Sequence, residues 1–207
     1  DALNVFPVPD GDTGTNMSMT IEAGVQAIES ENGLSIYEMS KKFSRGMLMG
    51  ARGNSGVILS QLFRGIYKGL TGYEEVGAKE LAKAFKSGVD QAYKAVMKPV
   101  EGTILTVARE ACDYANKKVS KKSTINEFFE FYMEEAYASL DRTPDLLPVL
   151  KDAGVVDSGA AGFIKVVEGM QKAINGEMLE RSDPEKAETA TVHRAAFKAP
   201  SELTFGY

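Results

Sequence analysis

The chain has 207 residues, 43% of them hydrophobic, which is enough for one domain with a core plus a tail, and its net charge is −5. Its Lys and Arg residues are spread along the chain without a basic run, which excludes a nucleic-acid partner. We expect a cytoplasmic protein, because no apolar run approaches the roughly 18 residues of a membrane span, no signal peptide is recognisable and one cysteine cannot form an intrachain disulfide.

A glycine-rich turn with two carboxylates comes first along the chain, in the string Pro9-Asp10-Gly11-Asp12-Thr13-Gly14-Thr15-Asn16-Met17. Pro7 and Pro9 favour extended backbone before this turn, which leaves the side chains of Asp10 and Asp12 free to converge. Two carboxylates directed at one point repel each other unless a cation lies between them. Hard oxygen ligands suit Mg²⁺, which commonly shares the phosphates of a substrate. The turn therefore predicts a magnesium and phosphate site.

A helix is expected directly after this turn. Apolar residues at helical spacing predict it: Met17, Ile21, Val25 and Ile28. Thr13, Thr15 and Asn16 are candidate caps for its N-terminus, and Gly14 permits a ligand to approach the backbone closely. Because a helix N-terminus attracts anions, this helix would contribute to the phosphate site.

The rest of the chain shows a succession of amphipathic helices. Two capping boxes predict helix starts, at Ser35-Ile36-Tyr37-Glu38 and at Thr124-Ile125-Asn126-Glu127. Apolar periodicity predicts the others: Val57–Leu70, Leu81–Val96, Ile104–Ala115 and Phe163–Ile174. Turn signals separate the helices at Asn32-Gly33, Thr71 to Gly77, Lys98-Pro99 and Pro144 to Pro148. No strand periodicity appears, so we predict an all-α domain of about eight helices.

A second glycine-rich string, Gly50-Ala51-Arg52-Gly53-Asn54-Ser55-Gly56, lies before the helix at Val57–Leu70. Its backbone amides suit a phosphate, Asn54 and Ser55 add side-chain contacts, and Gly56 admits a ligand near the helix start. It is not a P-loop, because the Gly-Lys-Ser/Thr ending and the flanking strand are absent. On its own the string fits an ordinary helix connection. Beside the first turn we interpret it as a phosphate loop.

These strings resemble a known family. Residues 4–17, which include the first turn, are similar to the nucleotide-binding domain of the dihydroxyacetone kinase superfamily, and most closely to the N-terminal domain of bacterial fatty acid kinase. The string at 50–56 matches as well, and so does Val156-Asp157-Ser158-Gly159-Ala160, where Ser158 replaces the usual proline. The resemblance implies an antiparallel helical barrel with ATP or ADP and two or more Mg²⁺ ions at one open end.

The resemblance also implies a domain boundary. We expect a DhaL-like ATP-binding kinase domain at residues 1–176, lacking an N-terminal helix, and a linker with the start of a following domain at 177–207.

The resemblance assigns roles to single residues. Asp10 and Asp12 would hold the metal ions, and Asn4, which replaces a third metal-binding aspartate, either binds metal through its carbonyl oxygen or only holds the loop. Asp157 and Thr103 would each either contact the nucleotide or merely cap a helix. The expected nucleotide contacts are Thr13, Gly14, Thr15, Asn16, Met17, Gly53, Asn54, Ser55, Gly56, Thr103, Asp157 and Gly159.

The implied function is ATP-dependent phosphorylation of a fatty acid carboxylate, which gives an acyl phosphate for phospholipid synthesis. Phosphoryl transfer depends on positioning and charge neutralisation, so no protein nucleophile is required. Asp10, Asp12 and the nearby cation Arg52 are the catalytic candidates. No fatty-acid pocket is recognisable, and the resemblance implies that a separate fatty-acid-binding protein presents the acyl chain. A homodimer through the missing domains is a further expectation.

Other functions stay open. The chain also fits the ADP/ATP-binding subunit of a dihydroxyacetone kinase, or a nucleotide-binding module without catalysis. A haloacid-dehalogenase-like phosphatase fits less well, because the threonine of its D-x-D-x-T motif falls at Gly14 and no strand precedes Asp10. A calcium loop lacks its glutamate, since Ile21 occupies that position.

Overall fold

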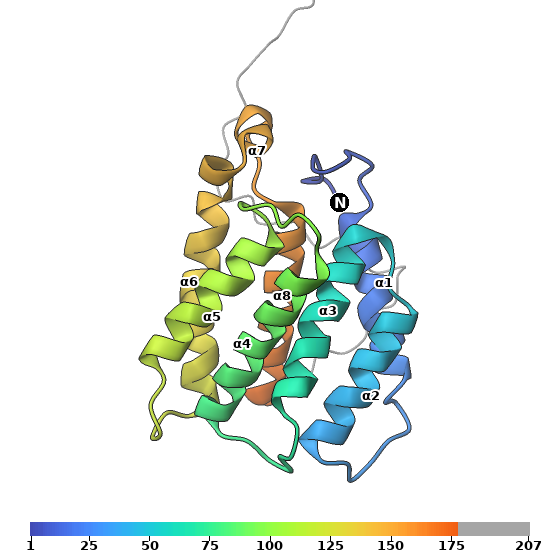
Figure 1. The fold of residues 1–207 in the computed structure, drawn as a ribbon, viewed down its shortest axis with the longest axis vertical. Coiled ribbons are helices and arrows are strands. Elements are labelled where there is room, and N and C mark those ends of the chain that lie inside the picture. Colours follow the sequence, from blue (N-terminus) through green and yellow to red (C-terminus); the bar gives the residue numbers. More distant parts are fainter. Residues whose placement is uncertain (178–207) are drawn as a thin grey trace, which may run out of the picture. The chain divides into compact units, whose positions relative to one another are not determined.

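The computed structural model of the chain describes residues 1–177, so nearly all of the linker and domain start predicted at 177–207 lies outside the described residues. The described chain forms eight α-helices and no strand, which confirms the all-α prediction (Figure 1). The helices are α1 (Thr13–Gln26), α2 (Ile36–Met49), α3 (Gly53–Gly69), α4 (Ala78–Ala95), α5 (Ile104–Lys118), α6 (Ile125–Leu146), α7 (Pro148–Ala153) and α8 (Ser158–Ile174).

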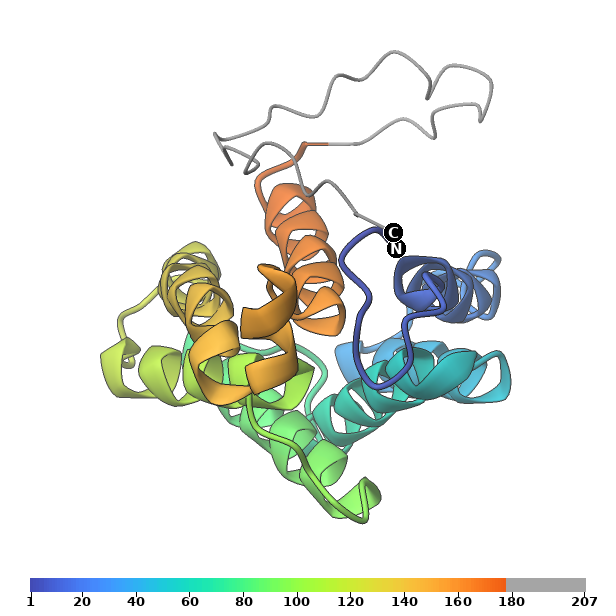
Figure 2. The ribbon, with the colours of Figure 1, turned by 90° about the horizontal axis from the view of Figure 1, so that it is seen from above.

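Six of the helices form a closed ring, in agreement with the expected barrel. Each packs on the next in the order α1, α3, α4, α5, α6, α8, and α8 returns to α1 (Figure 2). Helix α2 packs against α1 and α3, and α7 packs against α6. Helices α1, α3, α5 and α8 all begin at the end of the ring where the N-terminal loop lies (Figure 1). Their four N-termini therefore face the same region.

An aromatic cluster joins α4, α6 and α8 in the core. The ring of Phe85 meets the edges of Phe128 and Tyr132, with centroids 5.1 and 5.3 Å away, and Tyr132 extends the cluster to Phe163 on α8. All four side chains are 3% exposed or less. Burial of one such side chain contributes about 1.5 to 3 kcal/mol, so this cluster is a principal source of stability.

Helices α3 and α4 pack closely because glycine lies at their contact. A Cβ atom added to Gly65 would lie 2.3 Å from the carbonyl oxygen of Ser87 and 2.5 Å from the Cα of Gly88. Neither neighbour is the end of a flexible side chain, so any larger residue at Gly65 would force the two backbones apart.

Both predicted capping boxes are confirmed. The hydroxyl of Ser35 accepts a hydrogen bond from the amide of Glu38, and the hydroxyl of Thr124 accepts one from Glu127, each at 3.2 Å. Each glutamate carboxylate in turn accepts a hydrogen bond from the backbone amide of its cap residue.

The turn predicted at Pro144 to Pro148 lies at Leu147, because α6 continues through Pro144 to Leu146. Proline has no N–H to donate to the carbonyl of Leu140. The hydroxyl of Thr143 donates to that carbonyl instead, at 2.7 Å. Because this hydroxyl replaces the missing backbone donor, the helix continues past Pro144, and the chain turns only at Leu147, before the short helix α7.

The predicted caps of the first helix are also wrong. Helix α1 begins at Thr13, its N-cap residue is Asp12, and the side chain of Asp12 makes no capping hydrogen bond. Thr15 lies inside the helix, where its amide and hydroxyl contact the carboxylate of Asp1 at 3.1 and 2.9 Å.

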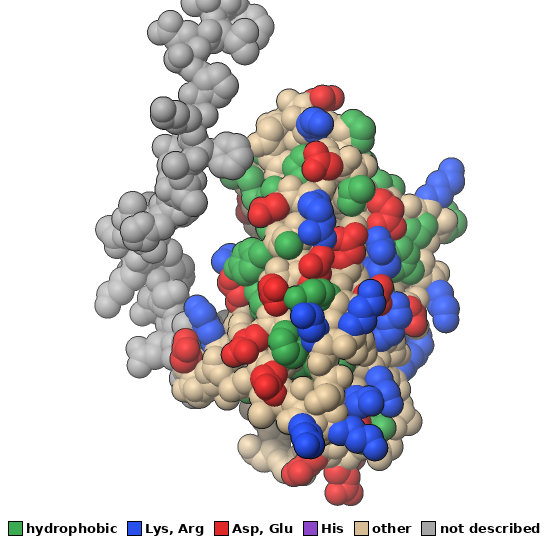
Figure 3. All heavy atoms as spheres, turned by 90° about the vertical axis from the view of Figure 1, so that its left-hand side faces the viewer, with side chains coloured by type: hydrophobic (Ala, Val, Ile, Leu, Met, Phe, Trp, Pro, Cys, Tyr) green, Lys and Arg blue, Asp and Glu red, His purple; other side chains and the backbone are tan. Residues whose placement is uncertain are grey.

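Charges of both signs are intermixed with hydrophobic side chains on the face drawn in Figure 3. In the described part of the chain, no helix has the length and apolar character needed to cross a membrane.

Candidate functional site

A cleft of about 770 Å³ opens where α1, α3, α5 and α8 begin. Its lining comes from four segments far apart in the sequence: the N-terminal loop, the start of α3, the connection between α4 and α5, and the start of α8. Predicted site residues line it from every segment: Asn4, Asp10, Asp12, Thr13, Asn16, Gly53, Asn54, Ser55, Thr103, Asp157 and Gly159. The fold therefore brings the separate strings into one place.

Five predicted site residues do not line the cleft: Gly14, Thr15, Met17, Arg52 and Gly56. Met17 is 3% exposed and belongs to the core. Gly56 faces Thr20, since an added Cβ would lie 2.3 Å from that hydroxyl oxygen. The side chain of Arg52 is exposed, and its backbone amide donates to Thr20 at 3.1 Å. Their roles stay predictions.

Two polar residues on the cleft were not predicted as site residues. Lys98 is the only Lys or Arg among the described residues of the lining, and it precedes Pro99 in a segment where the sequence signals no more than a turn. Ser158 also lines the cleft, and its hydroxyl donates to that of Thr13 at 3.2 Å. This bond links the starts of α8 and α1.

The cleft lining includes a set of apolar residues, here called the apolar wall, which the sequence did not indicate. Its members are Phe6, Pro7, Val8, Val57, Ile58, Ala95, Val96, Val100, Ile104 and Leu105. The cleft thus combines polar and apolar lining residues, which suits a ligand that has an anionic part and a hydrophobic part.

The polar region has the donor atoms that a magnesium ion requires. Asn4 is 7% exposed, and its Nδ2 donates to a carboxylate oxygen of Asp10 at 2.7 Å. Its Oδ1 is buried and has no hydrogen-bond partner. Two exposed carboxylates and this unpaired amide oxygen form a set of hard oxygen ligands. No cluster of three His, Cys, Asp or Glu exists among the described residues, so water and phosphate oxygens would complete the coordination.

Four helix N-termini make the cleft favourable for anions. Residues at or next to the first turn of α1, α3, α5 and α8 all line it: Thr13, Gly53, Ile104 and Ser158. Each helix directs the positive end of its dipole there, although carboxylates already accept first-turn amides of α1 (Thr15 to Asp1) and of α8 (Ala160 to Asp157). Gly53 has φ +58°, a conformation that favours glycine, and an added Cβ would lie 2.4 Å from the side-chain Nδ2 of Asn16 on α1.

Asp157 joins two of these N-termini. Its carboxylate accepts the amide of Ala160 at 2.8 Å, which caps α8, and it also accepts the amides of Gly159 and of Ile104, the first residue of α5. The amide of Asp157 itself donates to the hydroxyl of Thr143 on α6. Burial is the dominant influence on the side chain and raises the pKa of Asp157 to about 6, although the three amide donors oppose this.

Replacing Asp157 by asparagine is expected to change how stability depends on pH. Because its folded-state pKa of about 6 lies above the ordinary 3.8, the folded chain holds this proton more tightly than the unfolded chain. The resulting stabilisation is complete below pH 3.8 and is lost as the pH rises through about 6. The difference is about 3 kcal/mol at most.

Urea unfolding at pH 4 and pH 7 measures this effect. The free energy of unfolding of Asp157→Asn, relative to that of the original chain, should be larger at pH 7 than at pH 4, so the variant is relatively more stable at pH 7. The exposed Asp152→Asn on α7 is the control and should show no such change. An equal difference at both pH values for Asp157→Asn would contradict the expectation.

Comparison with known proteins gives one family. A family model of the DAK2 domain matches residues 7–172. An uncharacterized protein of Staphylococcus saprophyticus is 56% identical over 184 residues, which cover 89% of this chain and 33% of that protein. Uncharacterized proteins of Staphylococcus haemolyticus and Staphylococcus aureus are 55% and 54% identical over 180 residues, covering 87% of this chain and 33% of each relative. The chain thus spans about a third of the length of these relatives.

Proposed function

The chain belongs to the DAK2 domain family, a nucleotide-binding module of the dihydroxyacetone kinases, and on this premise we propose that it is the Mg²⁺-ATP-binding domain of a fatty acid kinase. The observation that carries the proposal is the cleft itself. Two carboxylates and the unpaired oxygen of Asn4 lie on its lining, at the place where four helices direct their N-termini. A magnesium triphosphate matches both features, since its metal needs oxygen ligands and its phosphates need N–H donors.

Each part of the cleft has a role in this proposal. Asp10, Asp12 and Asn4 would hold Mg²⁺, which would supply charge neutralisation for the phosphates. The amides and side chains of Asn54 and Ser55 orient phosphate oxygens. The apolar wall buries the base and excludes water, which strengthens electrostatic interactions in the cleft.

A cation that faces the phosphates completes the arrangement. Lys98 lines the cleft, whereas the exposed Arg52 does not. Lys98 is therefore better placed to stabilise the charge that develops during phosphoryl transfer. The reaction needs no protein nucleophile, because the γ-phosphate passes directly to the acceptor.

The acceptor in our proposal is the carboxylate of a fatty acid that a separate fatty-acid-binding protein presents, and the product is an acyl phosphate for phospholipid synthesis in the cytoplasm. The boundary near residue 176 and dimerisation through other domains belong to the same proposal. The chain spans only about a third of its relatives, so it is expected to bind nucleotide alone but to transfer phosphate poorly without the remaining domains.

An acceptor assay distinguishes this proposal from its alternatives. The longer protein, with ATP and Mg²⁺, is supplied either with a fatty-acid-loaded binding protein or with dihydroxyacetone on its own carrier subunit. We expect ATP consumption and acyl phosphate only with the fatty acid. Turnover with dihydroxyacetone would instead identify a dihydroxyacetone kinase subunit, and ATP binding without turnover on either acceptor would indicate a non-catalytic module.

A further inference from the structure

The connection between α4 and α5, residues 96–103, forms part of the cleft without being part of either helix. It contributes Val96, Lys98, Val100 and Thr103 to the lining. Between these residues Met97 is 98% exposed, whereas Val96 packs against the core at the start of the connection. The hydrogen bonds of the connection lie near its C-terminal end, where they fix the position of residues 100–103.

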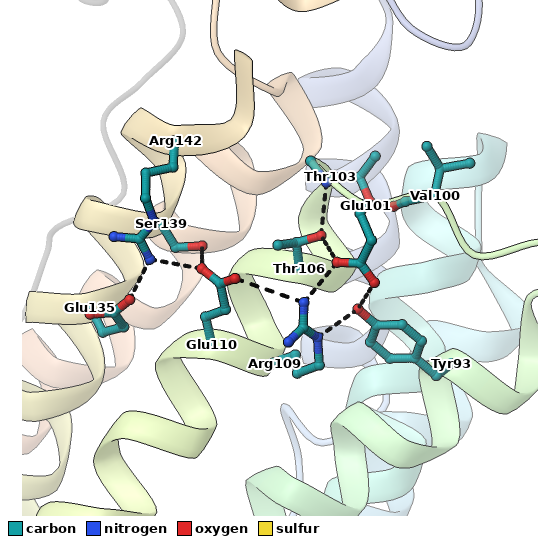
Figure 4. Close-up of polar contacts among 11 residues, drawn as sticks. Tyr93, Val100, Glu101, Thr103, Thr106, Arg109, Glu110, Glu135, Ser139 and Arg142 are labelled. Carbon is teal, nitrogen blue, oxygen red and sulfur yellow. Dashed lines mark hydrogen bonds and ion pairs between the residues drawn. The ribbon is translucent and has the colours of Figure 1, made fainter. Parts of the chain in front are cut away.

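Glu101 is the residue by which this connection is held. Its carboxylate accepts hydrogen bonds from Thr106 Oγ1 at 2.6 Å, from Arg109 Nη2 at 2.7 Å and from Tyr93 Oη at 3.1 Å. Arg109 Nε also donates to Tyr93 Oη at 3.1 Å, so the three side chains form a closed cluster (Figure 4). Burial opposes the charge, yet these donors outweigh it and lower the pKa of Glu101.

The cluster spans both helices that flank the connection. Tyr93 lies in the last turn of α4, while Thr106 and Arg109 lie in the first turns of α5. None of these three residues lines the cleft. Glu101 therefore ties the connection to two helices from outside the ligand site.

Gly102 lies where the backbone of the connection packs closely between α5 and the end of α6. Its amide donates to Thr106 Oγ1 at 2.9 Å, and its φ is +80°. An added Cβ would lie 2.9 Å from the carbonyl oxygen of Thr143 and 2.8 Å from the Cβ of Leu147. The backbone is thus pressed against the end of α6 on one side and bonded to α5 on the other.

We propose that Arg109 is a positioning residue, which with Tyr93 holds Glu101 and thereby fixes the connection that presents Lys98, Val100 and Thr103 to the ligand. The identity of this ligand rests on the proposed function. The position of the connection does not depend on the proposed function, because it can be measured on the chain without any ligand.

A matched control exists in the same network. Arg142 on α6 contacts Glu110 at 2.8 Å and Glu135 at 2.5 Å, and Arg109 approaches Glu110 at 3.8 Å (Figure 4). Arg142 makes none of the bonds to Glu101. Arg142→Met therefore removes ion pairs of the same kind from the same network, while the contacts that hold the connection stay intact.

The experiment compares Arg109→Met with Arg142→Met in two measurements. Amide hydrogen exchange over residues 96–103, measured without ligand, should be about tenfold faster or more in Arg109→Met and unchanged in Arg142→Met. The bond to Arg109 must open before these amides exchange, and opening a charge-assisted bond costs more than about 1.4 kcal/mol, which corresponds to a factor of about ten in rate. The Kd for ATP with Mg²⁺ should rise about tenfold in Arg109→Met only. Circular dichroism checks that both variants keep their helices.

Further variants cover the case in which Arg109→Met fails to fold. Glu101→Gln should reproduce both changes, and in combination with Arg109→Met it should add little, because the two residues share one interaction. Lys98→Met should weaken ATP binding without faster exchange.

The outcomes separate this inference from the proposed function. Unchanged exchange over 96–103 in both Arg109→Met and Glu101→Gln would overturn the positioning role, and so would faster exchange with an unchanged Kd for ATP. A chain that binds no ATP in any variant would refute the proposed function. If exchange were still faster in Arg109→Met and Glu101→Gln only, the positioning of the connection by Arg109 and Glu101 would be supported.

Discussion

Replacing Asp10 or Asp12 by alanine is expected to weaken the binding of Mg²⁺-ATP by about 100-fold or more, because the loss of a direct metal ligand exceeds the typical effect of losing a supporting residue. Without the metal, the remaining carboxylate would face the negative triphosphate directly. Both side chains are exposed and lie before or at the start of α1, so helix content should change little, although Asp10→Ala also leaves the buried Nδ2 of Asn4 without its acceptor.

Calorimetric titration of each variant with ATP and Mg²⁺ measures this effect. Asp141→Ala is the matched control, because Asp141 is exposed on α6 and lies outside the cleft. ATP affinity equal to that of the control in both cleft variants would show that these carboxylates do not hold the metal.

Replacing Phe128 by alanine is expected to have the opposite pattern, with a large loss of stability and little effect on the ligand. Phe128 is fully buried, and its ring lies 5.1 Å from Phe85 and 5.2 Å from Phe129. Truncation of such a ring leaves a cavity and typically costs about 3 to 5 kcal/mol. Phe128 does not line the cleft, so ATP affinity should persist at temperatures where the variant is folded.

Urea unfolding of Phe128→Ala and of Glu130→Ala tests this. Glu130 is exposed on the same helix, and its removal should change the free energy of unfolding by less than about 0.5 kcal/mol. A loss below about 1 kcal/mol in Phe128→Ala would mean that the aromatic cluster is not a principal source of stability.

Local signals explain which parts of the fold were predictable. The capping boxes at Ser35 and Thr124 are decided within four residues, and the structure confirms both. The start of α3 was expected several residues too late, because its first turn, Gly53–Gly56, consists of small residues that carry no apolar periodicity. Asp157 was expected either to contact the nucleotide or to cap a helix, and it caps α8.

The site was predictable where its chemistry is carried by short strings, and not where it depends on packing. Asp10, Asp12 and Asn54 were expected on the cleft and line it. The bond from Ile104 to Asp157 joins residues far apart in the sequence, so no local pattern reveals it. The same holds for the apolar wall, since its members come from three segments that meet only in the folded chain.

Binding of ATP to the unmodified chain, titrated once with Mg²⁺ and once with a chelator, tests whether the metal bridges the nucleotide to the cleft. We expect measurable binding with Mg²⁺ and affinity at least about 100-fold lower without it, because the triphosphate would then meet two uncompensated carboxylates. Equal affinity under both conditions would contradict a metal-bridged nucleotide site at Asp10 and Asp12.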